Sequence, residues 1–332
     1  MIEEVYANIY RSEIPLPRNP LKSLNSYVIK GDDRNLIIDT GFNVTEAREA
    51  FFSNLEALEV DPGKADVIVT HLHSDHSGLA YDLSLMGAKL FMSQGDGSAV
   101  NRIHQHRAWR STTDRMRMYG LVLNDEHMNS HPGKAYAPGG TFDFTVLAED
   151  DVITIGNYQL TVVSVPGHTP DMINLYERNH QIYFSGDHVL DPITPNITYW
   201  GEEYPVILQQ YLDSLKKIYA YPIKLMLPAH RALIHDHPRR IDELLEHHAL
   251  RMDEILGILS HSEQPMTVAE IASRMTWKIR ADNWDAFPVA QKIFAVGEAM
   301  SHLDLIVHKQ WAVMNDVNGV LHFASQVNEL LD

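Results

Sequence analysis

The chain has 332 residues, a formal net charge of -17 and no cysteine. Its length accommodates two domains of ordinary size. The lack of thiols excludes disulfides, thiolate metal ligands and a cysteine nucleophile, so any metal must be bound by imidazole and carboxylate groups. The acidic balance argues against non-specific binding to nucleic acid or to an anionic membrane surface.

The N-terminal stretch MIEEVYANIY lacks the basic and then apolar layout of a secretory signal. No apolar run approaches the roughly 18 residues that a membrane-spanning helix needs. Together with the cysteine-free composition, these features predict a cytoplasmic protein that does not associate with membranes.

The first 90 residues alternate short apolar, β-branched runs with an amphipathic stretch, which is typical of α/β layering. The pattern predicts strands at residues 26–29, 36–38 and 67–69 and a helix at residues 45–58. Residues 95–140 depart from this pattern and are rich in His, Arg and Met. We expect a mostly helical insertion there.

Strand patterns return after the insertion and indicate a second half of the sheet structure. They cover residues 142–146, 152–155, 159–165, 182–184 and 225–227. Residues 1–237 are therefore predicted to form the catalytic domain, with the helical insertion inside it.

The last third of the chain reads as helices followed by a hairpin. Helices are predicted at residues 241–259 and 288–305, and a third opens at Thr267, with Glu270 placed to complete a capping box. An Asn318-Gly319 turn predicts the hairpin. We interpret residues 238–332 as a winged-helix-like domain.

The stretch T-H-L-H-S-D-H-S-G, Thr70–Gly78, directly follows an apolar run. Because side chains alternate along a strand, His71 and His73 are expected to point the same way as the strand ends. Asp75 and His76 then fall in the following turn or helix start, close enough to serve a second ion. A chance cluster is the alternative, since the chain contains 19 histidines.

Three more candidate ligands follow predicted strands. They are His168 in V-P-G-H-T-P-D, Asp187 in F-S-G-D-H and His230 in L-P-A-H. Each alone could equally be an ordinary polar loop residue. With the first motif they supply five imidazoles and two carboxylates, which is enough for two ions of four or five ligands each.

The ordered pattern H-x-H-x-D-H with a later His, Asp and His, preceded by N-S-Y-V-I and I-I-D-T-G, resembles the metallo-β-lactamase-fold hydrolases. The resemblance covers about residues 5–235 and is greatest to the glyoxalase II and lactonase-like dinuclear branch. It implies an α/β fold, the αββα sandwich, with two mixed sheets face to face, helices outside and the metals at one sheet edge. The C-terminal part resembles, more weakly, the winged-helix domain of one branch.

The resemblance also implies the role of each site residue. His71, His73 and His168 would bind one metal, Asp75, His76 and His230 the other, and Asp187 would bridge both. Asp39 of the D-T-G turn would support the ligands without touching a metal, unless it is a plain turn residue. Asp75 would also handle the proton as the leaving group departs.

Such a site predicts a reaction type. Two ions about 3.5–4 Å apart lower the pKa of a bridging water and polarise the oxygen under attack. We therefore predict a dinuclear metal-dependent hydrolase whose bridging hydroxide cleaves a thioester, ester or lactone of a small molecule. Zinc is the expected metal, and iron and manganese also suit these ligands.

Two other functions are compatible with the same ligands. One is a phosphodiesterase or nuclease acting on single-stranded RNA, although residues 241–332 carry 6 basic and 14 acidic residues, which disfavours nucleic acid. The other is a mononuclear iron persulfide dioxygenase-like enzyme or a metal-bearing binder. Apolar stripes in the C-terminal helices make a homodimer possible.

The substrate pocket is the least determined feature of the sequence. The stretch Asp191–Trp200 follows the proposed bridging aspartate, and Tyr199 and Trp200 are candidate substrate walls. The Tyr199 hydroxyl could assist a carbonyl oxygen, while ordinary loop packing is the alternative. Cations in the insertion predict either a solvated face or a lid for an acidic substrate. They are His104, His106, Arg107, Arg110, Arg115 and Arg117.

Overall fold

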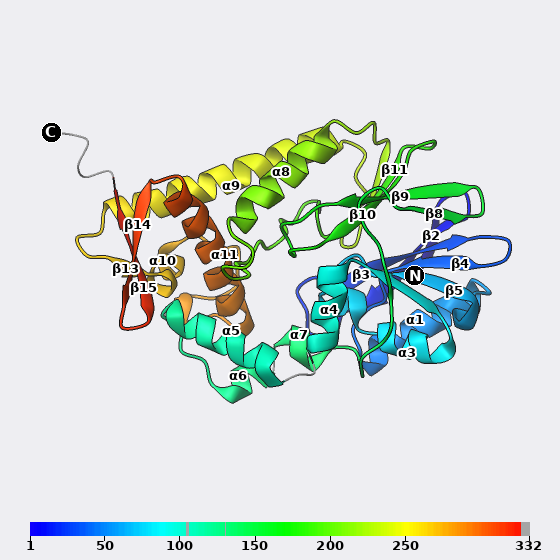
Figure 1. Ribbon diagram of the computed structural model, residues 1–332, viewed down its shortest axis with the longest axis horizontal. Coiled ribbons are helices and arrows are strands. Elements are labelled where there is room, and N and C mark those ends of the chain that lie inside the picture. Colours follow the sequence, from blue (N-terminus) through cyan, green and yellow to red (C-terminus); the bar gives the residue numbers. More distant parts are fainter. Residues whose placement is uncertain (104–105, 130, 327–332) are drawn as a thin grey trace. The chain divides into compact units, whose positions relative to one another are not determined.

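The computed structural model describes residues 1–103, 106–129 and 131–326 (Figure 1). Within them the chain forms two compact units. The first unit holds residues 1–103, 132–195 and 214–241, and the second holds the other described residues. His104 of the predicted lid and residues 327–332 of the predicted C-terminal domain lie outside the described residues.

The first unit contains a seven-stranded mixed sheet. Its order along the sheet follows the chain, with antiparallel pairing from β1 to β4 and parallel pairing from β4 to β7. The strands are β1 (Ile2–Tyr6), β2 (Ile9–Pro15), β3 (Ser23–Lys30), β4 (Asn35–Ile38), β5 (Ala65–Ile68), β6 (Lys89–Met92) and β7 (Thr145–Val146).

A five-stranded mixed sheet completes the first unit. Only β11 and β12 are parallel in it, and the order is β12-β11-β10-β9-β8. The strands are β8 (Val152–Ile155), β9 (Tyr158–Ser164), β10 (Ile173–Glu177), β11 (Ile182–Gly186) and β12 (Leu225–Pro228). Figure 1 shows the two sheets stacked beside each other.

Both faces of the first sheet are buried because apolar residues occupy consecutive strand positions. Ile29 and Ile38 belong to one buried cluster with Phe184 of the second sheet, so they lie between the sheets. Their neighbours Val28 and Ile37 belong to another cluster, which includes helix α1 (Thr45–Ala57). Two mixed sheets flanked by helices confirm the predicted α/β metallo-β-lactamase fold.

Short helices make up the described part of residues 94–135. They are α4 (Gln94–Arg102), α5 (His106–Met118), α6 (Asp125–Asn129) and α7 (Pro132–Ala135). The other helices of the described chain are η1 (Pro62–Lys64), α2 (Ser74–Ser77), α3 (Ala80–Met86), α8 (Ile207–Tyr219), α9 (His237–Ser260), α10 (Val268–Arg274), η2 (Trp284–Ala286) and α11 (Val289–His308).

The second unit contains a three-stranded antiparallel sheet in the order β13-β15-β14. Its strands are β13 (Met266–Thr267), β14 (Ala312–Val317) and β15 (Val320–Ser325). Helix α10 begins with the predicted capping box, in which the side chains of Thr267 and Glu270 each accept a hydrogen bond from the other's backbone amide. The C-terminal part is thus a small antiparallel sheet with helices.

Gly78, the last residue of the histidine-rich motif, has no room for a side chain. A Cβ there would meet the carbonyl oxygen of Gly41 and lie 2.6 Å from the Asn43 nitrogen. We expect Gly78→Ala to lower the free energy of unfolding by about 1–3 kcal/mol because backbone must move. Gly257, in α9, has open space where a Cβ would stand, so Gly257→Ala should raise it by about 0.5–1 kcal/mol. Urea denaturation measures both changes, and equal shifts would contradict this reading.

Candidate metal centre

The histidine-rich motif departs from the expected strand geometry. Strand β5 ends at Ile68, so His71 and His73 lie in a loop instead of alternating along a strand end. The prediction extended the strand over Val69, whose amide instead bonds to the Phe91 carbonyl as the chain leaves the sheet. The two rings still reach one point, and α2 follows directly after His73.

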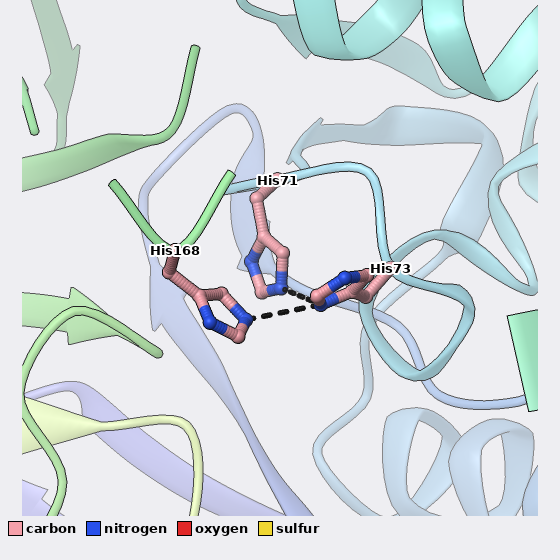
Figure 2. A group of neighbouring side chains, drawn as sticks. All are labelled: His71, His73 and His168. Atoms are coloured by element: carbon pink, nitrogen blue, oxygen red, sulfur yellow. Dashed lines mark hydrogen bonds between the residues drawn. The ribbon is translucent and has the colours of Figure 1, made fainter. Parts of the chain in front are cut away.

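Three imidazoles meet at this point (Figure 2). His71 Nε2 lies 3.1 Å from His73 Nδ1, and His168 Nε2 lies 3.0 Å from the same atom. A ring nitrogen has one proton or one lone pair, so it cannot form two good hydrogen bonds. Nitrogens bound to one tetrahedral zinc at about 2.0–2.1 Å stand about 3.3 Å apart, close to these separations.

A second group forms from α2 and the loop after β12. It consists of Asp75, His76 and His230, all buried. Asp75 Oδ2 lies 3.4 Å from His230 Nε2 and 3.9 Å from His76 Nε2. These separations are too long for good hydrogen bonds but suit three ligand atoms around one ion.

The Asp187 carboxylate lies between the two groups. One oxygen, Oδ2, is 3.6 Å from His168 Nε2 of the first group. The other, Oδ1, is 3.4 Å from His230 Nε2 and 3.6 Å from His76 Nε2 of the second group. Each oxygen therefore faces a different set of imidazoles.

Several buried atoms here have no hydrogen-bond partner among the described residues. They are Nε2 of His76, Nε2 of His230 and Oδ1 of Asp187. The opposite nitrogens are occupied, because His76 Nδ1 lies 2.8 Å from Asp39 Oδ2 and His230 Nδ1 lies 2.8 Å from the Ser23 carbonyl. Unsatisfied buried polar atoms are costly. A metal ion would satisfy all three, so the residues present fit a metal site.

The histidine pKa values differ between the two groups: they are lowered for His71 and His73 of the first group and raised for His76 of the second. Burial, followed by the neighbouring histidines, holds the pKa of His71 well below 6.5 and lowers the pKa of His73 to about 3. Both rings are thus neutral at pH 7, the form that binds metals. Burial also opposes charge on His76, but Asp39, Asp187 and Asp75 together raise its pKa well above 6.5.

Asp39 lies behind the ligands. It adopts a left-handed conformation with φ 62° directly after β4, and its carboxylate accepts hydrogen bonds from the Thr70 amide at 2.8 Å and the Thr70 hydroxyl at 2.9 Å. Thr70 Oγ1 is in turn 3.1 Å from His71 Nδ1. Sequence reasoning missed Thr70, although its place immediately before His71 was a usable signal.

We expect Asp39→Asn to weaken metal binding by roughly 10–100-fold, since it removes the charge that orients His76 and supports Thr70. Metal affinity measured by chelator competition tests this expectation. Asp66→Asn, which alters the ion pair between Asp66 of β5 and Arg34, the residue before β4, is the matched control. Equal metal affinity in the Asp39 variant and the control would show that Asp39 does not support metal binding.

Tyr199 and Trp200, the predicted substrate walls, lie in the second unit. The Tyr199 amide donates to the Gly297 carbonyl, and its ring lies 6.5 Å from that of Tyr119. The Trp200 carbonyl accepts a 2.6 Å hydrogen bond from Arg115 of α5. Arg115 therefore serves a structural contact in the unit, and the substrate roles of Tyr199 and Trp200 stay predictions.

The fold and the arrangement of histidines and aspartates define a class of protein. The sequence matches the model of the Metallo-beta-lactamase superfamily over residues 20–230, and the chain belongs to that superfamily. Among the described residues, no helix has the length and apolar character needed to cross a membrane.

Particular relatives bear names that describe thioester cleavage. The chain is 26% identical over 177 residues to the acyl-coenzyme A thioesterase MBLAC2 of Homo sapiens, covering 50% of this chain and 58% of that protein. It is 24% identical over 243 residues to the atrochrysone carboxyl ACP thioesterase of Aspergillus fumigatus, covering 73% of this chain and 46% of that protein. The chain thus spans only about half the length of these curated relatives.

Two solved structures resemble nearly the whole chain. A metallo-beta-lactamase family protein from Thermus thermophilus has a TM-score of 0.82 at 21% identity, covering 96% of this chain and 99% of that one. A beta-lactamase domain protein from Burkholderia ambifaria has a TM-score of 0.79 at 25% identity, covering 97% and 94%. The structural similarity to these two proteins therefore includes the C-terminal part of the chain.

Proposed function

We propose that this chain is a metal-dependent hydrolase that cleaves acyl thioesters of small molecules. The observation that carries the proposal is the Asp187 carboxylate, whose two oxygens face two separate groups of buried ligand atoms. An arrangement of this kind suits a pair of ions that share one carboxylate.

The proposed ligands are the seven residues predicted from the sequence. His71, His73 and His168 would hold one ion, Asp75, His76 and His230 the other, with Asp187 shared. Zinc is the proposed metal, with iron and manganese as the alternatives. When bound, the ions supply Lewis-acid polarisation of the carbonyl and a hydroxide nucleophile at neutral pH.

The protein's own groups orient the ligands and handle protons. The contacts of His76 with Asp39 and of His230 with Ser23 fix which ring nitrogen faces the centre. Asp75, whose Oδ2 lies 3.4 Å from His230 Nε2, is the proposed proton carrier: its carboxylate would take up the proton of the attacking hydroxide and return it to the departing sulfur as the thiol leaves.

The thioester is favoured over other acyl groups by the names of relatives, which are acyl-coenzyme A and acyl carrier protein thioesterases. We further propose that Tyr199 and Trp200 contact the acyl group. The element order α9, β13, α10, α11, β14, β15 supports a winged-helix-like domain from residue 238, and its exposed β14 edge is compatible with a homodimer.

A substrate screen with the metal-loaded and chelator-stripped protein tests the proposal. The probes are acyl-coenzyme A thioesters of several chain lengths, a lactone, a simple ester and bis-p-nitrophenyl phosphate. We expect the acyl-coenzyme A thioesters to be cleaved faster than the other probes, with release of free thiol that depends on zinc. Metal-independent turnover, or cleavage of the phosphodiester alone, would overturn the proposal, and the second result would favour the nuclease alternative.

A further inference from the structure

A buried carboxylate outside the ligand set connects the two loops of the three-histidine group. Asp96 lies in the first turn of α4 and is 1% exposed. Its Oδ2 accepts hydrogen bonds from the Leu72 amide at 3.1 Å and from the Thr169 hydroxyl at 2.5 Å. One oxygen thus joins two segments that are far apart in the sequence.

The two donors flank the proposed ligands. Leu72 lies between His71 and His73, and Thr169 directly follows His168. Both segments lie outside the sheets, because β5 ends at Ile68 and the chain between β9 and β10 is a loop. The positions of the three rings therefore depend on contacts of this kind as well as on sheet pairing.

The connection is reciprocal. The Asp171 backbone also hydrogen-bonds to the Asp96 carboxylate, and the Asp171 carboxylate accepts a 2.6 Å hydrogen bond from the Gly95 amide at the start of α4. Helix α4 thus supplies the Asp96 carboxylate to donors of the loop after β9, and that loop supplies the Asp171 carboxylate to the Gly95 amide of the helix. Such an arrangement restrains the loop in more than one direction.

Burial of this carboxylate is costly. Burial raises the pKa of Asp96 to about 7, although the hydrogen bonds from Thr169 and Leu72 favour the charged form. A buried carboxylate is costly unless hydrogen bonds to it compensate for the lost water. Among the described residues, the donors to Asp96 belong to the two loops that carry the proposed ligands.

We propose that Asp96 is a positioning residue that holds the loops of His71, His73 and His168 at the spacing of a single metal ion. The proposal rests on the proposed metal-dependent function. Asp96 acts through Leu72 and Thr169, and it selectively supports the three-histidine ion over the ion of the Asp75 group.

Zinc affinity of the full chain, measured by competition with a chromophoric chelator, tests this role in three variants. Asp96→Ala removes every acceptor and should weaken one of the two zinc sites by roughly 10–100-fold while sparing the other. Asp96→Asn keeps an oxygen for both Leu72 and Thr169, so it should recover most of the affinity. Thr169→Val removes one of the donors to Asp96, so its zinc affinity should lie between those of Asp96→Ala and Asp96→Asn.

Gln94→Ala is the matched control, because Gln94 lies in the same turn and its exposed side-chain amide donates to the Ser98 hydroxyl, on the surface of α4. It should leave zinc affinity unchanged. Circular dichroism and thermal melting establish that each variant is folded, and if Asp96→Ala does not fold, Thr169→Val and Asp96→Asn decide the question.

Unchanged affinity in folded Asp96→Ala would overturn the positioning role, as would equal weakening of both zinc sites in step with a lower melting temperature. Either result leaves the proposed function intact if the unaltered protein binds zinc and cleaves thioesters. An unaltered protein that binds no zinc would instead overturn the proposed function, and the positioning role with it.

Discussion

Replacement of Asp187 by alanine is expected to abolish hydrolysis and to weaken both metal sites together. The reason is geometric, since Oδ2 faces His168 and Oδ1 faces His76 and His230. Loss of a shared ligand should lower metal affinity by more than the roughly 10–100-fold that follows removal of a residue that only supports a ligand. The Asp187 pKa, which burial would raise, is instead held well below 3.8 by His230 and His76, so the group is an anion at pH 7.

The measurement is metal content by elemental analysis beside the rate of thioester cleavage. Asp82→Ala is the control. The Asp82 carboxylate forms a 2.8 Å ion pair with Arg48 and belongs to neither ligand group. Near-normal turnover with two ions still bound in Asp187→Ala would show that the bridging assignment is wrong.

Replacement of His71 by alanine should remove one ion and abolish hydrolysis while leaving the protein folded. Its ring belongs to the three-histidine group, whereas the second group keeps all of its own ligand atoms. Outside the group the ring contacts the Thr70 hydroxyl, which Asp39 continues to hold, so a loss of fold is not expected. Hydrolysis should fail because one ion alone lacks its partner in polarising the carbonyl.

Elemental analysis, circular dichroism and the thioester assay together test this prediction. His261→Ala is a suitable control, because His261 is exposed just after α9 and contacts the Gly257 carbonyl. An unchanged rate in His71→Ala would remove the three-histidine ion from the reaction, and an unfolded variant would show that the ring is structural.

The grouping of the ligands was accessible from the sequence because each follows an apolar run. Those runs became β5, β9, β11 and β12, and their ends bring Asp187 and His230 beside the first motif. What pattern alone could not give was the loop geometry. The loop after β5 presents His71 through Nε2 and His73 through Nδ1, a choice that strand alternation does not predict.

Several elements were missed where polar residues interrupt the apolar pattern. Strand β10 is fully buried yet contains Asn174 and Glu177, whose side chains find partners within the fold: Asn174 accepts from Tyr183, and Glu177 contacts His180. Strand β1 carries exposed charged residues and β2 half-buried ones, while α8 was not predicted although its buried apolar residues recur at helical spacing. In β10, tertiary contacts outweighed local composition.

The supporting groups were the hardest to foresee. Asp96 occurs in S-Q-G-D-G, which reads as an ordinary helix start, and only the folded chain brings it to Leu72 and Thr169. Asp39 was identified through the D-T-G motif, but its contact with Thr70 depends on a left-handed backbone conformation that the sequence only permits.

X-ray diffraction from crystals of the zinc-loaded protein, recorded at the zinc absorption edge, tests the central claim most directly. We expect two anomalous peaks, one on each side of the Asp187 carboxylate. One should lie about 2.0–2.1 Å from the nitrogens of His71, His73 and His168, and the other at similar distances from the Asp75, His76 and His230 ligand atoms. A single peak, or peaks remote from Asp187, would contradict the dinuclear centre.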